Sequence, residues 1–344
     1  ETAYDRDLWR KMAAQGWTGI IFGEAYGGGD LGMVEMAAAM EEMGRALVPG
    51  PYLATVLLAG SALDAAGSEE QKQKYLAPIC RGDARATLAL LESGASWHPE
   101  AVAMTASATG NGYRLNGAKL FVPDAAVADF IVCAARAGSE LALLVVDSQA
   151  KGLTITAEPA IDATRRLCQV SFDNVEVACP DVLATGARAQ AALKRAIDVA
   201  TVGLVAEMVG GMQKVLDLSV AYAKARHQFG KPIGQFQAVQ HHCADMFVLT
   251  EASRSAAYYA AWAVQEQTPE AALAVSIAKV YASDACRDVG NRGIQVHGGM
   301  GFTWENDIHL YYRRAKASEI CFGDAAFHRE RIARLVLDRK PSSD

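Results

Sequence analysis

The sequence predicts a multidomain α+β protein in which an N-terminal α-helical domain precedes a middle β-domain and a C-terminal helical bundle. The spacing of apolar residues is helical at the start, changes to short β-type runs near residue 84, and becomes helical again near residue 186. The chain has 344 residues and is 51% hydrophobic, which is enough to bury more than one core. We therefore place the domains at residues 1–83, 84–185 and 186–344.

Short helices separated by chain breaks make up the expected N-terminal domain. Apolar residues recur at helical spacing in residues 4–15 and 31–46. Pro49-Gly50-Pro51 stops the second helix, because neither residue type continues a helix well. A further short helix is expected at residues 69–77, ending before Pro78.

The middle domain is expected to consist of short strands. Asn111-Gly112 and Asn116-Gly117 are turn signals between them. Several short strands at this spacing are typical of a barrel or a sandwich. The runs that predict strands are residues 87–91, 113–115, 130–134, 141–146 and 167–172.

The last domain is helical almost throughout. Its sequence contains few helix breakers and predicts helices at residues 187–226, 234–265, 269–291 and 325–337. Four long helices with short connections are typical of a helix bundle.

Composition argues against several classes of function. The net charge is −6 and no basic tract occurs, so we expect no nucleic-acid partner. Seven scattered cysteines without a C-x-x-C pair indicate reduced thiols, as in a cytoplasmic protein. We find no signal peptide and no long uncharged apolar run, and therefore expect neither export nor membrane insertion. His241, His242, Cys243 and Asp245 are too close in sequence to converge on one helix face, so no metal site is expected.

The end of the first bundle helix carries Arg226-His227-Gln228-Phe229-Gly230. Arg226 and Phe229 are three residues apart and can project from one side of the last turn. The planar guanidinium of an arginine suits a phosphate group. The alternative is an ordinary helix end, where a basic side chain complements the helix dipole.

A glycine-rich segment follows about seventy residues later, as Gln295-Val296-His297-Gly298-Gly299-Met300-Gly301. Three glycines in four residues let a backbone approach a ligand closely and expose N–H groups to an anion. Gln295 adds both a donor and an acceptor. The alternative is a plain loop between two helices.

The two segments together resemble the acyl-CoA dehydrogenase family, which has Arg-x-x-Phe-Gly at the end of one bundle helix and Gln-x-x-Gly-Gly-x-Gly later. The resemblance implies a helical domain, a β-barrel and a four-helix bundle. It implies that Arg226, Gln228, Phe229 and Gln237 contact FAD, and that FAD bridges two subunits. The residues expected from the neighbouring subunit are Gln295, Gly298 and Gly299. Further matching stretches are Glu24–Gly28, Leu115–Lys119, Phe236–Gln240, Ala244–Met246, Gly301–Glu305 and Tyr311–Lys316.

The expected catalytic base is missing from its usual place. The family removes the α proton of an acyl-CoA with a carboxylate, usually a Glu in a Tyr-Glu-Gly-Thr run. Here that run reads Cys321-Phe322-Gly323-Asp324, with Phe322 at the Glu position. Two candidates for the base remain, Asp324 and Glu207, unless this chain has no competent base at all.

Glu207 lies in the middle of the first bundle helix, among glycines at helical spacing. Gly203, Gly210 and Gly211 lie at i−4, i+3 and i+4, which could leave room for a ligand beside the carboxylate. The alternative is that these glycines permit close helix packing while Glu207 forms an ion pair or points outwards.

The positions that bind the flavin ring also differ from the family. Leu91 and Pro123 stand where the family usually has hydroxyl residues, and neither side chain can donate a hydrogen bond. The ring would then be held by backbone groups or by the β-domain of a different subunit.

The sequence therefore predicts an FAD-dependent acyl-CoA dehydrogenase that forms a 2,3-enoyl-CoA and passes electrons to an electron-transfer flavoprotein. Its expected assembly is a homo-oligomer or an α2β2 heterotetramer, as in members that shorten steroid or other bulky side chains. One alternative is a non-catalytic partner subunit that completes the FAD site of a related chain. Another is a flavin oxidase or monooxygenase on the same fold, with Asp324 as base.

Overall fold

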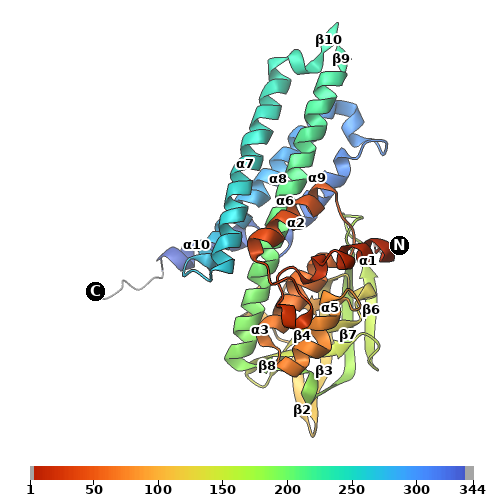
Figure 1. Cartoon of the computed structure of the whole chain (residues 1–344), viewed down its shortest axis with the longest axis vertical. Coiled ribbons are helices and arrows are strands. Elements are labelled where there is room, and N and C mark those ends of the chain that lie inside the picture. Colours follow the sequence, from red (N-terminus) through yellow and green to blue (C-terminus); the bar gives the residue numbers. More distant parts are fainter. Residues whose placement is uncertain (1–3, 338–344) are drawn as a thin grey trace, which may run out of the picture. The chain divides into compact units, whose positions relative to one another are not determined.

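The computed structural model describes residues 4–337 and divides into two compact units (Figure 1). The first unit contains the residues up to Gly32 and the segments Pro49–Ala160 and Thr164–Ala200. The second, which we call the bundle unit, contains Met33–Val48, Ile161–Ala163 and the residues from Thr201 onward. The predicted order of helical, β and helical parts is confirmed, whereas the division at residues 83 and 185 stays a prediction.

Most helices of the first unit are short. The Asp5 side chain begins α1 by accepting hydrogen bonds from the N–H groups of Asp7 and Leu8 at 2.8 and 2.9 Å. The α-helices are α1 Arg6–Ala14, α3 Ser61–Ala66, α4 Glu69–Gln71 and α5 Ala77–Cys80. The π-helical stretches are η3 Leu53–Gly60 and η4 Lys72–Leu76, and the 3₁₀ turns are η1 Trp17–Gly19, η2 Glu24–Tyr26, η5 Pro99–Ala101, η6 Ala125–Val127 and η7 Cys179–Asp181.

Two features of these helices differ from the prediction. Leu53–Ala66 is helical, although no helix was expected there. The residues of its first three turns are buried on every side, so the sequence shows no apolar stripe that would predict a helix. The helix predicted to end before Pro78 instead continues to Cys80. Pro78 is tolerated because it lies in the first turn of α5, after the π-helical stretch η4.

A single sheet forms the β-domain. Its strands follow the order β6-β7-β3-β2-β4-β5-β8, and β1 pairs in parallel with β4. Side chains from most of these strands meet in one apolar core that includes Leu115, Ile131 and Phe172. The bounds are β1 Ala86–Ala89, β2 Thr105–Thr109, β3 Gly112–Pro123, β4 Phe130–Ala137, β5 Glu140–Asp147, β6 Leu153–Glu158, β7 Leu167–Ala178 and β8 Val182–Thr185. Three of them, β2, β6 and β8, were not predicted: β2 has no large apolar residue, β8 has only four residues, and β6 was missed although its apolar and polar residues alternate.

The bundle unit contains long helices and one helix from early in the chain. α7 and α8 lie side by side, and α9 and α10 pack on α8 (Figure 1). The helices are α2 Met33–Arg45, the part of α6 Gly186–Ala225 from Thr201 onward, α7 Gln237–Gln265, α8 Ala271–His297, α9 Ile308–Ile320 and α10 Ala325–Leu337. The prediction missed α9 and ended α8 at residue 291, six residues before its end at His297.

Glycines set the crossing of α2 and α6. A Cβ atom on Gly44 would lie 2.0 Å from the carbonyl oxygen of Glu207, and one on Gly210 would lie 1.8 Å from that of Glu41. Both distances are far below van der Waals contact, so the two helix backbones touch where side chains are absent. An ion pair of 2.8 Å between Arg45 and Asp217 adds a polar contact between the same helices.

α6 is long and apolar enough to cross a membrane by length and composition. However, 83% of its most apolar window is buried inside the protein. That burial accounts for the composition, because a helix enclosed by other elements is apolar on all sides.

Candidate active site

The segment that follows α6 forms a tight hairpin. The N–H of Arg226 donates to the carbonyl of Tyr222 at 2.8 Å, which continues the last turn of the helix. Strands β9 His227–Gln228 and β10 Lys231–Pro232 then pair across Phe229 and Gly230. Both turn residues have positive φ, 54° and 80°, as a type I′ turn requires.

Phe229 is an unusual residue for that turn. A left-handed backbone disfavours residues other than glycine, asparagine and aspartate, and Phe229 is 90% exposed. Its one ring neighbour among the described residues is Phe236, edge-on with centroids 6.1 Å apart. The neighbouring predicted cofactor residues Arg226, Gln228 and Gln237 are also exposed. The hairpin therefore presents an aromatic ring and a guanidinium at the surface of the chain.

The glycine-rich segment begins on a helix and not in a loop. Gln295 lies in the last turn of α8 and is exposed. Gly298 has φ 57° and ψ −137°, a conformation open to glycine alone, so the fold itself requires it. Gly299 has no such requirement, and a Cβ atom there would meet no atom of this chain within 4 Å. Its missing side chain leaves the backbone open to approach from outside.

An aromatic stack joins the ends of the two helices that carry these segments. The Tyr222 ring, one turn before Arg226, stacks on the His297 imidazole with centroids 4.5 Å apart. Nδ1 of His297 lies 2.8 Å from the Gly293 carbonyl oxygen. Burial lowers the pKa of His297, against the opposing effect of that hydrogen bond. The structure thus brings the two predicted cofactor segments to neighbouring helix ends.

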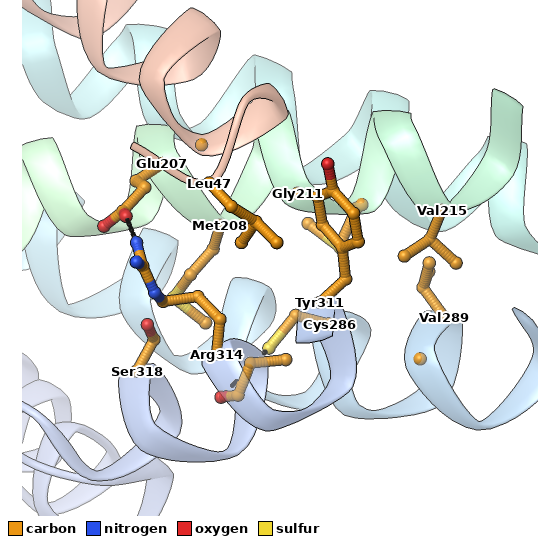
Figure 2. Close-up of a pocket in the computed structure, with 14 residues that line it drawn as sticks. Leu47, Glu207, Met208, Gly211, Val215, Cys286, Val289, Tyr311, Arg314 and Ser318 are labelled. Atoms are coloured by element: carbon orange, nitrogen blue, oxygen red, sulfur yellow. Dashed lines mark hydrogen bonds and ion pairs between the residues drawn. The ribbon is translucent and has the colours of Figure 1, made fainter. Parts of the chain in front are cut away.

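Glu207 lies in a buried ionic cluster (Figure 2). Arg314 of α9 donates from Nη1 to the Glu207 carboxylate and from Nε to Asp162 at 2.6 Å. The side chains of Arg314, Asp162 and Glu207 are only 6%, 2% and 5% exposed. Sequence reasoning missed Arg314 and Asp162, because no spacing relates residues 162, 207 and 314.

A narrow pocket adjoins the cluster, with about 20 Å³ of space for water-sized groups. Glu207 and Arg314 lie at one end, and Val215 and Val289 lie at the other (Figure 2). The lining between them comes from α6, α8, α9 and the end of α2, and it is mainly apolar. It includes Leu47, Met208, Gly211, Met212, Cys286 and Tyr311. A mainly apolar lining with polar groups at one end is the pattern of a small-molecule site, and in this structure the pocket has room for little more than a water molecule.

The glycines around Glu207 serve two purposes. Gly210 packs against the α2 backbone, as expected if these glycines permit close helix packing. Gly211 lines the pocket, where a Cβ atom would lie 3.9 Å from the Tyr311 ring. The structure therefore combines the ion pair and close packing with open space beside the carboxylate.

Asp324 caps a helix. Its carboxylate accepts a hydrogen bond from the N–H of Phe327 at 2.8 Å at the start of α10, and its side chain is exposed. Phe322, at the position of the usual base, is buried at 2% exposure with φ 59°. The Phe322 carbonyl lies 3.0 Å from Nε2 of His328.

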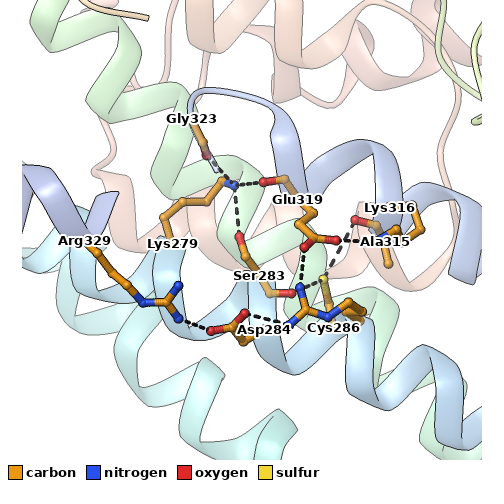
Figure 3. Close-up of polar contacts among 10 residues, drawn as sticks. Lys279, Ser283, Asp284, Cys286, Ala315, Lys316, Glu319, Gly323 and Arg329 are labelled. Atoms are coloured by element: carbon orange, nitrogen blue, oxygen red, sulfur yellow. Dashed lines mark hydrogen bonds and ion pairs between the residues drawn. The ribbon is translucent and has the colours of Figure 1, made fainter. Parts of the chain in front are cut away.

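A buried lysine holds the turn between α9 and α10 (Figure 3). Nζ of Lys279 donates to Oγ of Ser283 at 3.0 Å and to the carbonyls of Glu319 and Gly323 at 2.9 and 3.0 Å. Burial lowers the pKa of Lys279 to about 8, while nearby thiols and carboxylates oppose that shift. All three N–H bonds of the ammonium thus have an acceptor.

In the β-domain, the backbone carbonyls at the predicted ring-binding positions already accept hydrogen bonds within the chain. The carbonyl of Leu91 accepts from the N–H of Leu120 at 2.8 Å, and that of Pro123 accepts from Oγ1 of Thr87 at 2.6 Å. Leu91 is also buried. Among the described residues no group of three or more His, Cys, Asp or Glu side chains is arranged to hold a metal ion.

Comparison with known proteins covers nearly the whole chain. Three acyl-CoA dehydrogenase models match in order: the N-terminal domain at residues 1–83, the middle domain at 87–175 and the C-terminal domain at 189–337. A probable acyl-CoA dehydrogenase, YngJ of Bacillus subtilis, is 32% identical over 97% of this chain and 90% of its own.

Solved structures agree. The ChsE4-ChsE5 complex from Mycobacterium tuberculosis has a TM-score of 0.89 at 30% identity, over 98% of this chain and 90% of its own. An FAD complex of PigA has a TM-score of 0.91 at 26% identity, over 98% and 90% of the two chains. These findings confirm the predicted fold and support the predicted cofactor, FAD. The chain belongs to the acyl-CoA dehydrogenase family.

Proposed function

We propose that this chain is an FAD-dependent acyl-CoA dehydrogenase that converts an acyl-CoA to its 2,3-enoyl-CoA. The observation that carries this is the pairing of an exposed, left-handed Phe229 with the open backbone at Gly299, on helix ends joined by one aromatic stack. FAD, when bound, supplies the acceptor for the hydride that leaves the β carbon. The electrons would then pass to an electron-transfer flavoprotein in the cytoplasm.

The residues present fit the tail of FAD. The exposed Arg226 guanidinium suits the pyrophosphate, and the exposed Phe229 ring suits the adenosine portion. Gln228 and Gln237 add amide groups on the same surface. The residues that a neighbouring subunit would contribute are Gln295, Gly298 and Gly299. This arrangement requires an oligomer, either of identical chains or an α2β2 heterotetramer.

Glu207 is the proposed base, and it would accept the α proton on its carboxylate. The structural reason is its place at the polar end of the pocket, whereas Asp324 is exposed and caps α10. A base must reach the proton that it removes, and a pocket-lining carboxylate meets that condition better than a helix cap.

The direct test is to purify the protein, measure bound FAD and follow bleaching of its absorbance by short, branched and steroid-like acyl-CoA thioesters. Glu207→Gln should keep FAD and lose turnover by about 10²-fold or more. The matched change Asp324→Asn should retain turnover. Failure of every thioester to bleach the wild type would contradict the proposal. Oxygen consumption without acyl-CoA would instead indicate an oxidase or monooxygenase.

A second candidate is a partner subunit without its own activity. It is favoured by the buried Phe322 at the usual base position and by the apolar Leu91 and Pro123 at the ring positions. Co-purification with a related chain followed by FAD quantification separates the two candidates. One FAD per pair of unlike chains supports the partner subunit, and one FAD per copy of this chain supports the dehydrogenase.

A further inference from the structure

Three charged side chains from separate segments meet beside the pocket. Arg314 comes from α9, Glu207 from α6 and Asp162 from the short segment that the bundle unit includes. One guanidinium donates to two carboxylates, those of Glu207 and Asp162. A structural ion pair needs only one carboxylate, and the second one has to be explained.

We propose that Arg314 is a positioning residue that holds Glu207 and releases it into the pocket, while Asp162 keeps the guanidinium paired after the release. This inference rests on the proposed function, because it assigns a role to Glu207 as the base. It names Asp162 and Arg314 as residues that act through Glu207 without contacting the substrate.

The geometry shows why Asp162 matters. A buried guanidinium that loses its only carboxylate is left uncompensated, which is costly in a medium of low dielectric constant. Here Asp162 holds Nε at 2.6 Å, and the carbonyl of Val48 lies 3.5 Å from Nη2. Glu207 binds through the remaining nitrogen, Nη1. Arg314 therefore keeps a full counter-charge when Glu207 turns away.

The pocket offers a place for the released carboxylate. Gly211 lies one turn after Glu207 on the same helix and has no side chain to fill the space. Leu47, on the α2 side of the pocket, has φ 49°, a left-handed conformation that leucine rarely adopts. Strained residues of this kind cluster at functional sites and are held by the surrounding structure.

The chemical step balances within this arrangement. The α C–H bond breaks, its proton forms a bond to a Glu207 oxygen, and its electron pair forms the new double bond. A hydride leaves the β carbon with two electrons for the flavin cofactor of the proposed reaction. Glu207 becomes neutral, and the Arg314–Asp162 pair keeps its zero net charge throughout.

The first test measures exchange of the α proton of an acyl-CoA with deuterated water, which reports on the base separately from flavin reduction. Asp162→Asn removes the second carboxylate, so Glu207 should remain on Arg314. We expect α-proton exchange to fall by about tenfold or more with FAD content unchanged, a smaller loss than removing the base outright. Asp284→Asn is the matched control, because Asp284 pairs with Arg287 and Arg329 on the half-exposed surface. Unchanged exchange in Asp162→Asn would overturn the inference.

The second test does not depend on activity. A double-mutant cycle of Glu207→Gln and Arg314→Gln, read by thermal unfolding, gives the coupling between these two residues. The coupling should be larger when Asp162 is replaced by Asn, because the guanidinium then shares its charge with one carboxylate fewer. Equal coupling in both backgrounds would show that the carboxylates do not share Arg314.

The two measurements separate failure of the inference from failure of the proposed function. If the wild type exchanges no α proton and bleaches with no acyl-CoA, the proposed function fails, and the role of Arg314 in catalysis fails with it. If the wild type is active but Asp162→Asn is indistinguishable from it, only the inference fails. Arg314→Lys, which keeps the charge, should restore part of the activity lost in Arg314→Gln.

Discussion

The ring of Tyr222 stacks on the imidazole of His297 at a centroid distance of 4.5 Å, and this contact joins the last turn of α6 to the last turn of α8. Each helix then leads directly into one of the two proposed cofactor segments. Because the aromatic pair links the two helix ends, it also sets the positions of Arg226 and Gly298 relative to each other. Four predictions follow from this and the other contacts of the bundle unit.

Gly299→Val should disturb cofactor binding without disturbing the fold. A Cβ atom there would meet nothing within 4 Å in this chain, and the backbone is not left-handed. The branched side chain should instead block the approach of FAD or a second subunit. We expect purified Gly299→Val to melt near the wild-type temperature but to lose most of its FAD absorbance. Gly110→Val, at an equally open glycine in the β-domain, should retain FAD; equal loss in both would contradict the assignment.

Gly210→Ala and Gly211→Ala should change stability in opposite directions. A methyl group at Gly210 would lie 1.8 Å from the Glu41 carbonyl oxygen, so the free energy of unfolding should fall by about 3 kcal/mol or more. A methyl group at Gly211 would lie 3.9 Å from Tyr311, and the better helix propensity of alanine should add up to about 1 kcal/mol. Chemical denaturation of both variants measures this, and equal losses of stability in the two variants would contradict the prediction.

His328 should make the protein less stable in acid. Burial, helped by the charge of Lys279, lowers the pKa of His328 from 6.5 to about 3. Below pH 6.5 the unfolded chain binds a proton that the folded chain does not, so this contribution is present above pH 6.5 and is lost as the pH falls towards 3. The loss should approach roughly 5 kcal/mol. His328→Gln should have a flatter stability profile between pH 6.5 and 4, and an unchanged slope would contradict the assignment.

Lys279 should give a pH dependence in the alkaline range. Burial lowers its pKa from 10.5 to about 8, so between these values the unfolded chain binds more protons than the folded chain. The free energy of unfolding should therefore rise with pH in this window, by up to roughly 3 kcal/mol relative to Lys279→Met. Lys279→Met should also loosen the turn after α9, because the carbonyls of Glu319 and Gly323 lose their donor. Parallel profiles of wild type and variant would contradict a lowered pKa of Lys279.

The sequence predicted the order of the domains because the period of apolar residues reflects which face of each element is buried. The prediction failed where the apolar residues show no such period. Leu53–Ala66 lies among buried neighbours and shows no stripe, and β2 contains no large apolar residue, so neither gives a clear signal. Gln295 was expected in or near a loop, yet α8 holds it in its last turn and stops only where Gly298 turns the chain.

The candidate site was predictable in part. Arg226, Phe229 and Gly298 could be found because their chemistry lies within short segments. The partners of Glu207 could not, because Asp162 and Arg314 come from segments that only the folded chain brings together. A lone aspartate before β7 and an arginine within Tyr-Tyr-Arg-Arg carry no local signal of a buried pair.

The α2–α6 crossing has a consequence for how this protein can be divided. α2 lies in the N-terminal third of the sequence, yet its backbone fills the contact for which Gly210 has no side chain. A fragment that begins at residue 186 would keep every long helix, but the surface at Gly210 that α2 covers would be left bare. Asp217 would also lose its ion pair with Arg45. The boundaries of the family domains are therefore not the boundaries of the folding units. Exchanging domains between relatives should succeed only when α2 is transferred together with the bundle.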